Sequence, residues 1–150
     1  MRPQIHPMSA SMLTLVAAMA VYDAISSRVE GCAIKWPNDI VIDGRKVCGI
    51  LTEMSSELDN IHYVVIGIGI NVNTDDFPED IASVAASMHV ITGAYYKRAE
   101  IIADTWKAFE KYYDLFVQTE NLALMVDAYN QRLVNMAAFL NHHSAVHIHK

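Results

Sequence analysis

The sequence predicts an α+β domain in which a central antiparallel or mixed sheet is covered by helices. Three observations favour this class: a helical apolar pattern near the N-terminus, β-rich runs in the middle, and helical patterns in the second half. The 150 residues fit one domain, and a hydrophobic content of 53% is sufficient for one core. We therefore expect a single layered domain.

The first expected element is a helix that follows a short N-terminal segment. Residues 1–10 are predicted to hold a strand remnant and a loop, because two prolines interrupt regular structure there. Ser9 or Ser11 is expected to cap a helix that runs to about Ser27. Its apolar residues recur near helical spacing, so the helix should cover one face of the core.

Four β-rich runs are expected to form the sheet. Asp43-Gly44 between two of them predicts a tight hairpin, because both turn positions require a positive φ. A second turn is expected at residues 58–60, and the apolar run that follows it is typical of a central strand buried on both faces. The runs predicted as strands are residues 32–36, 40–42, 47–54 and 63–70.

The second half of the chain predicts helices. A short helix is expected over about residues 79–88, and a final one, capped by Asn121, over about residues 122–130. Between them lies a long amphipathic helix that should pack on the sheet. Its apolar face is predicted to consist of Ile102, Trp106, Phe109, Tyr113 and Phe116.

The composition excludes some classes of function. Acidic residues outnumber basic ones by 17 to 11, and the net charge of −6 is opposite in sign to that of a typical nucleic-acid-binding domain. Two cysteines cannot form a disulfide framework, which favours a reducing compartment. The longest apolar run, from Met12 to Tyr22, is shorter than a membrane span. We expect a cytoplasmic protein that binds neither nucleic acid nor membranes.

The densest group of residues able to carry chemistry lies around the predicted hairpin. Pro37 should end the pairing of two strands and leave the polar groups of Asn38 and Asp39 free at the end of the sheet. The hairpin returns Lys46 to the same end, where a lysine among strand residues must be solvated or paired. Gly49 removes a side chain, as at a bulge or a ligand contact. An ordinary hairpin with a solvated basic tip remains an open alternative.

A second motif, residues 67–73 (GIGINVN), ends the last predicted strand. It lacks the third glycine and the following helix of a dinucleotide fingerprint. The flat glycine strand could instead form the floor of a ligand pocket with Asn71 at its rim, or it could serve close packing within the sheet. The histidines of residues 141–150 are a weak metal signal, and we expect no native metal site.

Together these motifs resemble the catalytic domain of biotin protein ligases, the biotin–[acetyl-CoA-carboxylase] ligases. Residues 35–40 (KWPNDI) and 46–53 (KVCGILTE) are similar to that family's KWPND and K-x-x-GIL-x-E signature. Residues 67–73 are similar to its GIGIN-x-N strand. The resemblance covers about residues 1–135 and implies the biotin/lipoate ligase fold, which is class II synthetase-like.

The resemblance implies a reaction in two steps. The carboxylate of biotin attacks the α-phosphorus of ATP, with Mg²⁺ shielding the other phosphates, and gives biotinyl-5′-adenylate and pyrophosphate. A lysine of the biotin carboxyl carrier protein of acetyl-CoA carboxylase then attacks the mixed anhydride and forms an amide. Two anions meet in the first step, so a fixed cation is needed, and the resemblance gives that role to Lys46.

The resemblance also assigns the other site residues. An apolar slot with few polar anchors suits the fused ureido ring of biotin. The biotin-binding residues it implies are Lys46, Gly49, Ile50, Leu51, Gly67, Gly69 and Ile70. The residues it implies on the ATP side are Lys35, Asn38, Asp39, Lys46 and Asn71.

The sequence departs from the family pattern at both ends. The family's Gly-Arg-Gly-Arg loop and Gln-Thr segment lie upstream of the KWPND motif, and this sequence contains neither, nor a winged helix, nor the small C-terminal β-barrel. We expect a partial catalytic domain at residues 1–135 and a divergent His-containing tail at 136–150.

Three alternatives stay open. The first is a lipoate or octanoate ligase on the same fold. The second is a non-catalytic remnant that binds biotin or a carrier protein. The third is an interaction domain that pairs as a homodimer through an exposed sheet edge.

Overall fold

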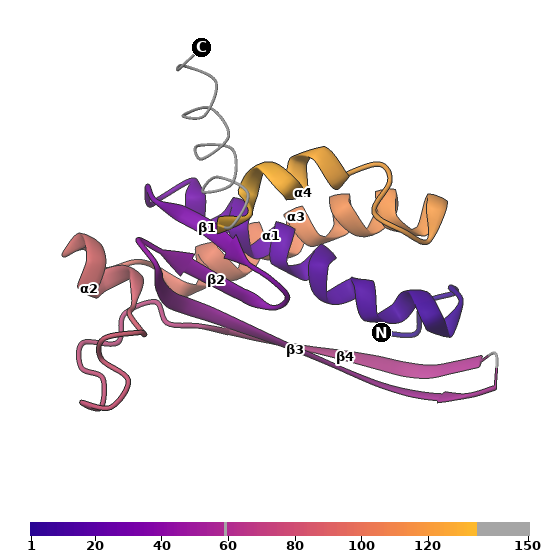
Figure 1. Ribbon diagram of the computed structural model, residues 1–150, viewed down its shortest axis with the longest axis horizontal. Coiled ribbons are helices and arrows are strands. Elements are labelled where there is room, and N and C mark those ends of the chain that lie inside the picture. The colour runs from indigo at the N-terminus through magenta and orange to yellow at the C-terminus, as the bar shows by residue number, and fades with distance from the viewer. Residues whose placement is uncertain (59, 135–150) are drawn as a thin grey trace, which may run out of the picture.

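The computed structural model describes residues 1–58 and 60–134, and it confirms the α+β class (Figure 1). The four strands form one antiparallel sheet in the order β1-β2-β3-β4. The elements are η1 (Pro7–Met12), α1 (Leu13–Ser26), β1 (Cys32–Lys35), β2 (Asp39–Ile42), β3 (Arg45–Glu57), β4 (Asn60–Ile70), α2 (Met88–Thr92), α3 (Arg98–Thr119) and α4 (Val126–Arg132).

The sheet is a meander in which each strand pairs with the next. The predicted turn between β2 and β3 is confirmed, with positive φ angles of 49° at Asp43 and 79° at Gly44. β3 continues to Glu57, three residues beyond the predicted end. β1 and β2 are much shorter, so β3 and β4 extend beyond them as a two-stranded ribbon (Figure 1).

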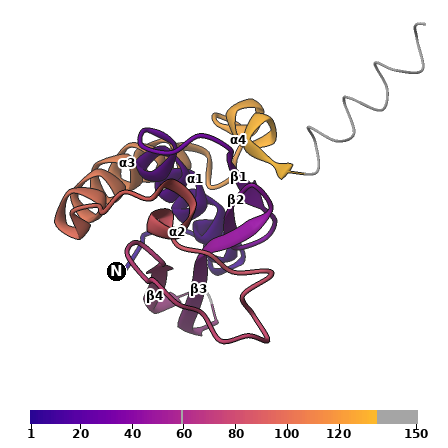
Figure 2. The ribbon, with the colours of Figure 1, turned by 90° about the vertical axis from the view of Figure 1, so that its left-hand side faces the viewer.

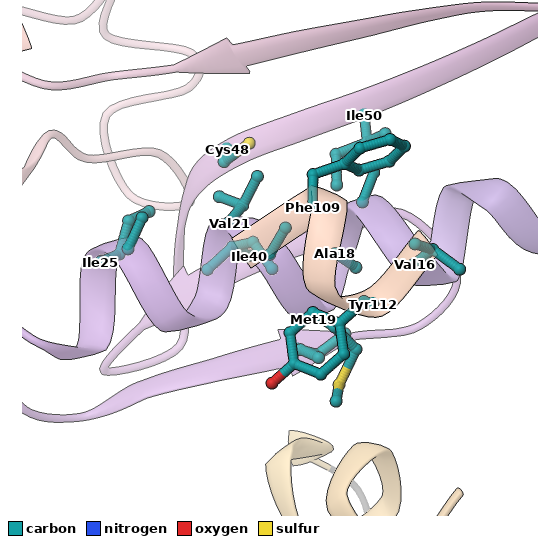
Figure 3. Close-up of a cluster of buried hydrophobic side chains, with 14 of the residues drawn as sticks. Val16, Ala18, Met19, Val21, Ile25, Ile40, Cys48, Ile50, Phe109 and Tyr112 are labelled. Carbon is teal, nitrogen blue, oxygen red and sulfur yellow. The ribbon is translucent and has the colours of Figure 1, made fainter. Parts of the chain in front are cut away.

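The core lies between the sheet and α1. Apolar residues of α1 and of the inner face of β2 and β3 are buried there (Figure 3). Ile40, Cys48 and Ile50 are at most 2% exposed. The helices α1, α3 and α4 lie on the same side of the sheet (Figure 2). The opposite, outer face of the sheet therefore has no helix over it in the part of the chain that the structure describes.

The long helix α3 is confirmed, but its predicted packing is wrong in two respects. It packs against α1 rather than directly on the sheet. Its buried stripe is shifted by one residue at three positions: Ile102 and Trp106 are 56% and 63% exposed, and Tyr112 is buried instead of Tyr113. The shift follows from the direction of α1, which the spacing along α3 does not reveal. The residues that it buries are Ile101, Thr105, Phe109, Tyr112 and Phe116.

The N-terminal cap was predicted wrongly. A 3₁₀ helix, η1, precedes α1, and its cap is His6, whose Nδ1 accepts a hydrogen bond from the Met8 N–H. Pro7 lies at the first position of η1 and preorganises it. Met1 exchanges two hydrogen bonds with Val64 of β4, which agrees with the expected strand remnant although no strand is formed.

The β4 run was predicted to be a central strand, and this is wrong: β4 is the last strand of the described sheet. Val64 is its one fully buried residue, and its side chains are otherwise partly or largely exposed. Apart from the pair with Met1, the outer edge of β4 has no ladder partner among residues 1–58 and 60–134. The apolar composition of this run therefore predicted a burial that the β4 side chains do not have.

Two short helices also differ from expectation. Residues 79–84 form turns, and α2 begins at Met88, where a helix was expected to end; the Ser87 hydroxyl caps it. The segment before Ser87 is instead hydrogen-bonded to β3, which prevents a helix there. Asn121 does cap a turn, but α4 itself begins only at Val126.

The helix Pro7–Ser26 has the length and mean hydropathy, 1.6, to cross a membrane, so it exceeds the apolar run expected from sequence. Of its most apolar 18-residue window, 56% is buried within the fold. Core helices of soluble proteins meet the same criteria. Asp23 on α1 also accepts a hydrogen bond from the Tyr112 hydroxyl and forms a salt bridge with Arg132, which link this helix to α3 and α4.

Candidate active site

A β-bulge directs Lys46 to the outer face of the sheet. The pairing of β2 with β3 shifts by one residue, so that Ile40 faces Cys48 while Val41 faces Lys46. Val47 is the extra residue, and both it and Cys48 are buried. Without the bulge, strict alternation would turn Lys46 towards the core, because Cys48 and Ile50 point there. The bulge instead puts Lys46 on the same face as Gly49 and Leu51.

Lys46 crosses its own strand to reach an acid on the next one. Its Nζ atom lies 2.6 Å from Asp39 Oδ1, and Asp39 is the residue opposite Gly49 in the β2–β3 ladder. The Lys46 side chain is 48% exposed and that of Asp39 is 19% exposed. The lysine is therefore paired and partly solvated, as the sequence required, and its ammonium remains accessible from the outer face.

The main chain of Lys46 is held by the segment that precedes α2. The Lys46 N–H donates to Val84 O at 2.8 Å, and the Ala86 N–H donates to Lys46 O at 2.9 Å. Asn71 supports the same segment, since its Nδ2 donates to Ala86 O at 3.2 Å and its N–H donates to Val47 O. Sequence reasoning missed Val84 and Ala86, because main-chain contacts leave no residue-type signal.

The main-chain carbonyl and the side-chain Nδ2 of Asn38 are both hydrogen-bonded, whereas Pro37 led us to expect free polar groups. The Asn38 carbonyl accepts from the Ile50 N–H at 2.8 Å, and its Nδ2 donates to Ile50 O at 2.9 Å. Asn38 thus holds both main-chain groups of Ile50 where β2 ends. Asp39, predicted as its free neighbour, is engaged with Lys46. The two residues fix the geometry around Gly49.

The glycines of β4 form the floor of an open cavity on the outer face. Gly69 pairs with Gly49 and Gly67 pairs with Leu51. A side chain added at Gly67 or Gly69 would have only a main-chain oxygen, at 3.7 or 3.8 Å, as its neighbour within 4 Å. The space is therefore open above them. The cavity measures about 490 Å³ and is lined by Asn38, Lys46, Gly49, Ile50, Leu51, Gly67, Ile68 and Gly69.

Four of the predicted site residues do not line this cavity: Asp39, which reaches it through its pair with Lys46, and Ile70, Lys35 and Asn71, which lie apart from it. Ile70 lines a groove of about 510 Å³ between β4 and α3, on the helix side of the sheet. Lys35 is exposed at the end of β1, opposite Asp39 in the ladder. Asn71 follows β4 and donates its amide hydrogen to Ala86, as described above. The structure thus brings together the residues expected around biotin, except Ile70.

A second cavity adjoins the first and was not foreseen. It measures about 390 Å³ and shares Asn38, Ile50 and Leu51 with the outer-face cavity. The Thr14 hydroxyl donates to Thr52 Oγ1 at its wall. The other lining residues, from η1, the start of α1 and the KWPND segment, are Ser11, Met12, Leu15, Trp36 and Pro37.

The two thiols are not suited to nucleophilic chemistry. Burial raises the pKa of Cys48 to about 12, and the negative charge of Asp39 adds to the effect. Burial raises the pKa of Cys32 to about 12 as well. Both cysteines are free. Within the described ranges, no group of three or more His, Cys, Asp or Glu residues could hold a metal ion; the histidines of the tail lie outside them.

Comparison with known proteins agrees with this geometry. Residues 1–71 match the biotin/lipoate A/B protein ligase family. The chain is 45% identical over 116 residues to a bifunctional ligase/repressor BirA of Bacillus spizizenii. It is 43% identical over 75 residues to a biotin–[acetyl-CoA-carboxylase] ligase of Paracoccus denitrificans. That alignment covers 48% of this chain and 31% of the relative.

A solved structure shows the same fold. The biotin protein ligase of Aquifex aeolicus in complex with biotin and ATP superposes with a TM-score of 0.74 and 28% identity, over 87% of this chain and 55% of that one. Residues 1–71 therefore resemble the biotin/lipoate A/B protein ligase family. Over a longer stretch, the chain is similar to biotin protein ligases.

The match is partial with respect to the relatives. The alignment to the Bacillus spizizenii protein covers 75% of this chain but 36% of that protein. This chain thus spans about a third of the length of the curated relatives that it matches most strongly. The predicted division at residue 135 falls at the border of the described residues, and the tail beyond it lies outside them.

Proposed function

We propose that this chain carries the part of an active site that contains Lys46. That site joins biotin to the AMP part of ATP and then transfers biotin to a carrier protein. The observation that carries the proposal is the outer-face cavity, where one accessible cation lies beside a glycine floor. The match of residues 1–71 to the ligase family and the similarity to a ligase bound to biotin and ATP support the same reaction.

Lys46 supplies the charge that the first step requires. A biotin carboxylate oxygen attacks the α-phosphorus of ATP, the new P–O bond forms, and pyrophosphate leaves with the electrons of the broken bond. Carboxylate and triphosphate repel each other, so a cation held between them lowers the barrier. The Asp39 pair leaves Lys46 Nζ near Gly49, at one end of the cavity. From there it can contact both anions.

The second step uses a lysine of the partner protein. Its neutral amine attacks the acyl carbon of biotinyl-5′-adenylate, an amide forms, and AMP departs. The open cavity on the outer face leaves room for an approaching side chain. The partner that we propose is the biotin carboxyl carrier protein of acetyl-CoA carboxylase. The site therefore takes up biotin and ATP as substrates and releases pyrophosphate and AMP.

The biotin ring is proposed to lie over Gly67 and Gly69, against the exposed side chain of Leu51. The absence of Cβ atoms there permits close approach to the main chain. Asn38 and Asp39 are proposed on the ATP side, with Lys35 and Asn71 further away. The side chains of Asn38, Asp39 and Asn71 also make hydrogen bonds or an ion pair within the chain itself.

Mg²⁺ is proposed to accompany ATP. The described residues offer no cluster of three acidic or histidine ligands, which fits an ion bound mainly through phosphate oxygens. Asp39 is the one carboxylate near the cavity, and it could contribute a ligand. When bound, the ion would neutralise charge on the phosphates. The chain's own contribution to that charge balance is Lys46.

Calorimetric titration of the 150-residue chain with biotin, and then with biotin plus Mg-ATP, tests the proposal. We expect saturable binding that Lys46→Ala weakens by about tenfold or more, which corresponds to about 1.4 kcal/mol. Lipoate and octanoate serve as competitors, and stronger binding of either would favour the related-acid alternative. Folded protein that releases no heat with biotin would contradict the proposal.

Pyrophosphate exchange separates the enzyme from a binding remnant. Biotin-dependent exchange of labelled pyrophosphate into ATP is the expected result if adenylate forms on this chain. Biotin binding without exchange would instead support a non-catalytic remnant. In either case the second step is measured separately, as transfer of biotin to a lysine of a carrier domain.

The exposed edge of β4 favours a second candidate role, pairing with another copy of the chain. Tyr63 and Val65 are about half exposed on β4, whose outer edge pairs only with Met1 among the described residues. Unpaired apolar edges are templates for strand addition. Gel filtration with and without biotin is the test. A monomer at all concentrations would argue against a homodimer.

A further inference from the structure

We propose that Gly49 is a positioning residue for Lys46: its missing side chain is the space through which the lysine reaches Asp39. The inference rests on the proposed function, because it concerns the cation of that reaction. The glycine would otherwise be explained as part of the floor under biotin. The contacts around Gly49 indicate that the lysine, rather than a ligand, occupies this space.

The three site glycines differ in what a side chain would meet. A Cβ at Gly49 would lie 3.2 Å from both Cε and Nζ of Lys46, and 3.8 Å from Asp39 Oδ1. Both lysine contacts are shorter than ordinary van der Waals contacts. A Cβ at Gly67 or Gly69 would meet one main-chain oxygen at an ordinary distance. Only Gly49 therefore leaves room for a functional side chain of the same strand.

The rest of the structure prevents Lys46 from moving as a whole. Its N–H and carbonyl are both bonded to the segment of Val84 and Ala86. Asn38 holds the neighbouring Ile50 on both main-chain groups. A side chain at Gly49 could therefore be relieved only by rotation of the lysine side chain, which would carry the ammonium away from Asp39.

Asp39 makes that rotation unfavourable. Its Oδ1 atom is inaccessible to solvent and makes no hydrogen bond to the described residues, so the nearby ammonium is what compensates its charge. Gly49→Ala should thus place two requirements in conflict. Either the lysine keeps its pair under steric compression, or it leaves Asp39 uncompensated. Both outcomes change the position of Nζ relative to the cavity.

The consequence for the reaction is a loss of rate rather than of biotin affinity. A displacement of a reacting or stabilising group by less than 1 Å can lower a rate by one to two orders of magnitude. We expect Gly49→Ala to slow adenylate formation by about tenfold, with a biotin Kd changed by less than about threefold. Gly67→Ala should instead weaken biotin binding and change the rate of adenylate formation little, because its side chain fills the biotin slot and does not touch Lys46.

The most informative readout is the Nζ NMR signal of Lys46, which does not depend on activity. Asp39→Asn supplies the reference signal of the unpaired lysine, and Lys46→Ala assigns the resonance. We expect Gly49→Ala to move the Lys46 signal towards that reference, whereas Gly67→Ala leaves it in place. Circular dichroism confirms that each variant is folded.

Each result has one meaning. A Lys46 signal that is unchanged in Gly49→Ala overturns the inference, whether or not the chain binds biotin. A shifted signal in a chain that neither binds biotin nor forms adenylate supports the positioning of Lys46 and contradicts the proposed function. A shifted signal together with a tenfold slower reaction supports both.

Discussion

The two ends of β3 differ in how the structure supports them. At the N-terminal end, residues 45–49 pair with β2, β4 joins on the other side from residue 48, and α1 packs against the strand. At the C-terminal end, β3 and β4 form a ribbon that extends beyond β1 and β2 (Figure 1). Val47, Cys48 and Ile50 at the first end are buried, whereas Glu53 and Met54 at the second are exposed.

The difference shows which end of β3 is held in a fixed position by its neighbours. The candidate site lies at the supported end, where a bulge, a clamp by Asn38 and a bridge to Ala86 hold each strand in one register. Preorganised groups of this kind are what an electrostatic role for Lys46 requires. A two-stranded ribbon has only marginal stability of its own. Four predictions follow from this contrast.

The largest effect is expected in thiol reactivity. With its pKa near 12 instead of near 9, Cys48 has about a thousandfold less thiolate than an ordinary cysteine at pH 8. Alkylation of the native chain should be slower to that extent than alkylation in denaturant. The matched control is the thiol introduced by Ser56→Cys on the exposed ribbon, which should react at an ordinary rate. Equal alkylation rates at the two positions would contradict the difference in burial between the two ends of β3.

The same shift predicts a pH dependence of stability. The folded pKa of Cys48 is raised above the unfolded value, so its contribution is complete below about pH 9 and is lost as pH rises towards 12. The free energy of unfolding should fall over that window, by up to about 1.4 kcal/mol per pH unit for each such thiol. Denaturant titrations at several pH values measure it, with Cys48→Ala as the control that reduces the slope. A slope unaffected by that substitution would exclude the thiol as its source.

A core substitution should distinguish the inner face of β3 from β4. Ile50 and Ile68 are direct partners in the ladder, but Ile50 is 2% exposed and Ile68 is 36% exposed. Ile50→Ala should lower the free energy of unfolding by about 2 to 5 kcal/mol. Ile68→Ala should cost about 1 kcal/mol, because less of its surface leaves water. Chemical denaturation gives both values, and a larger cost at Ile68 would mean that β4 is more enclosed than described.

The smallest effect is expected from the asparagine clamp. Asn38→Ala removes the hydrogen bond to Ile50 O and should cost about 1 kcal/mol. Asn60→Ala, at the exposed start of β4, should change stability by less than about 0.5 kcal/mol. Amide hydrogen exchange at Ile50 provides a local check, because that N–H donates to Asn38 O. Unaltered exchange there would show that Asn38 is not a clamp.

Local rules predicted the parts of the molecule that local chemistry determines. Asp43-Gly44 gave the hairpin because few residues adopt positive φ, and the long pattern of α3 gave a helix. The resemblance of residues 46–53 and 67–73 to known motifs predicted most of the residues that gather at the cavity. Lys46 was expected to be solvated or paired, and it is paired with Asp39.

The failures came from contacts distant in sequence. The bulge at Val47 depends on pairing with β2 and has no signature in β3 itself. Residues 79–85 have helical composition, but hydrogen bonds to Lys46 hold the following segment against β3. The apolar run of β4 predicted burial, whereas its position at the edge is a property of the whole sheet. Ile70 was misplaced relative to the cavity because strand alternation turns it to the other face.

The central claim is that biotin binds over the glycines on the outer face of the sheet, beside Lys46. Titration of the ¹⁵N-labelled chain with biotin, followed by amide chemical shifts, tests it most directly. The account predicts the largest shifts at Leu51, Gly67 and Gly69, with little change at Ile102 and Thr105. Shifts confined to the groove between β4 and α3, at those last two residues, would contradict it.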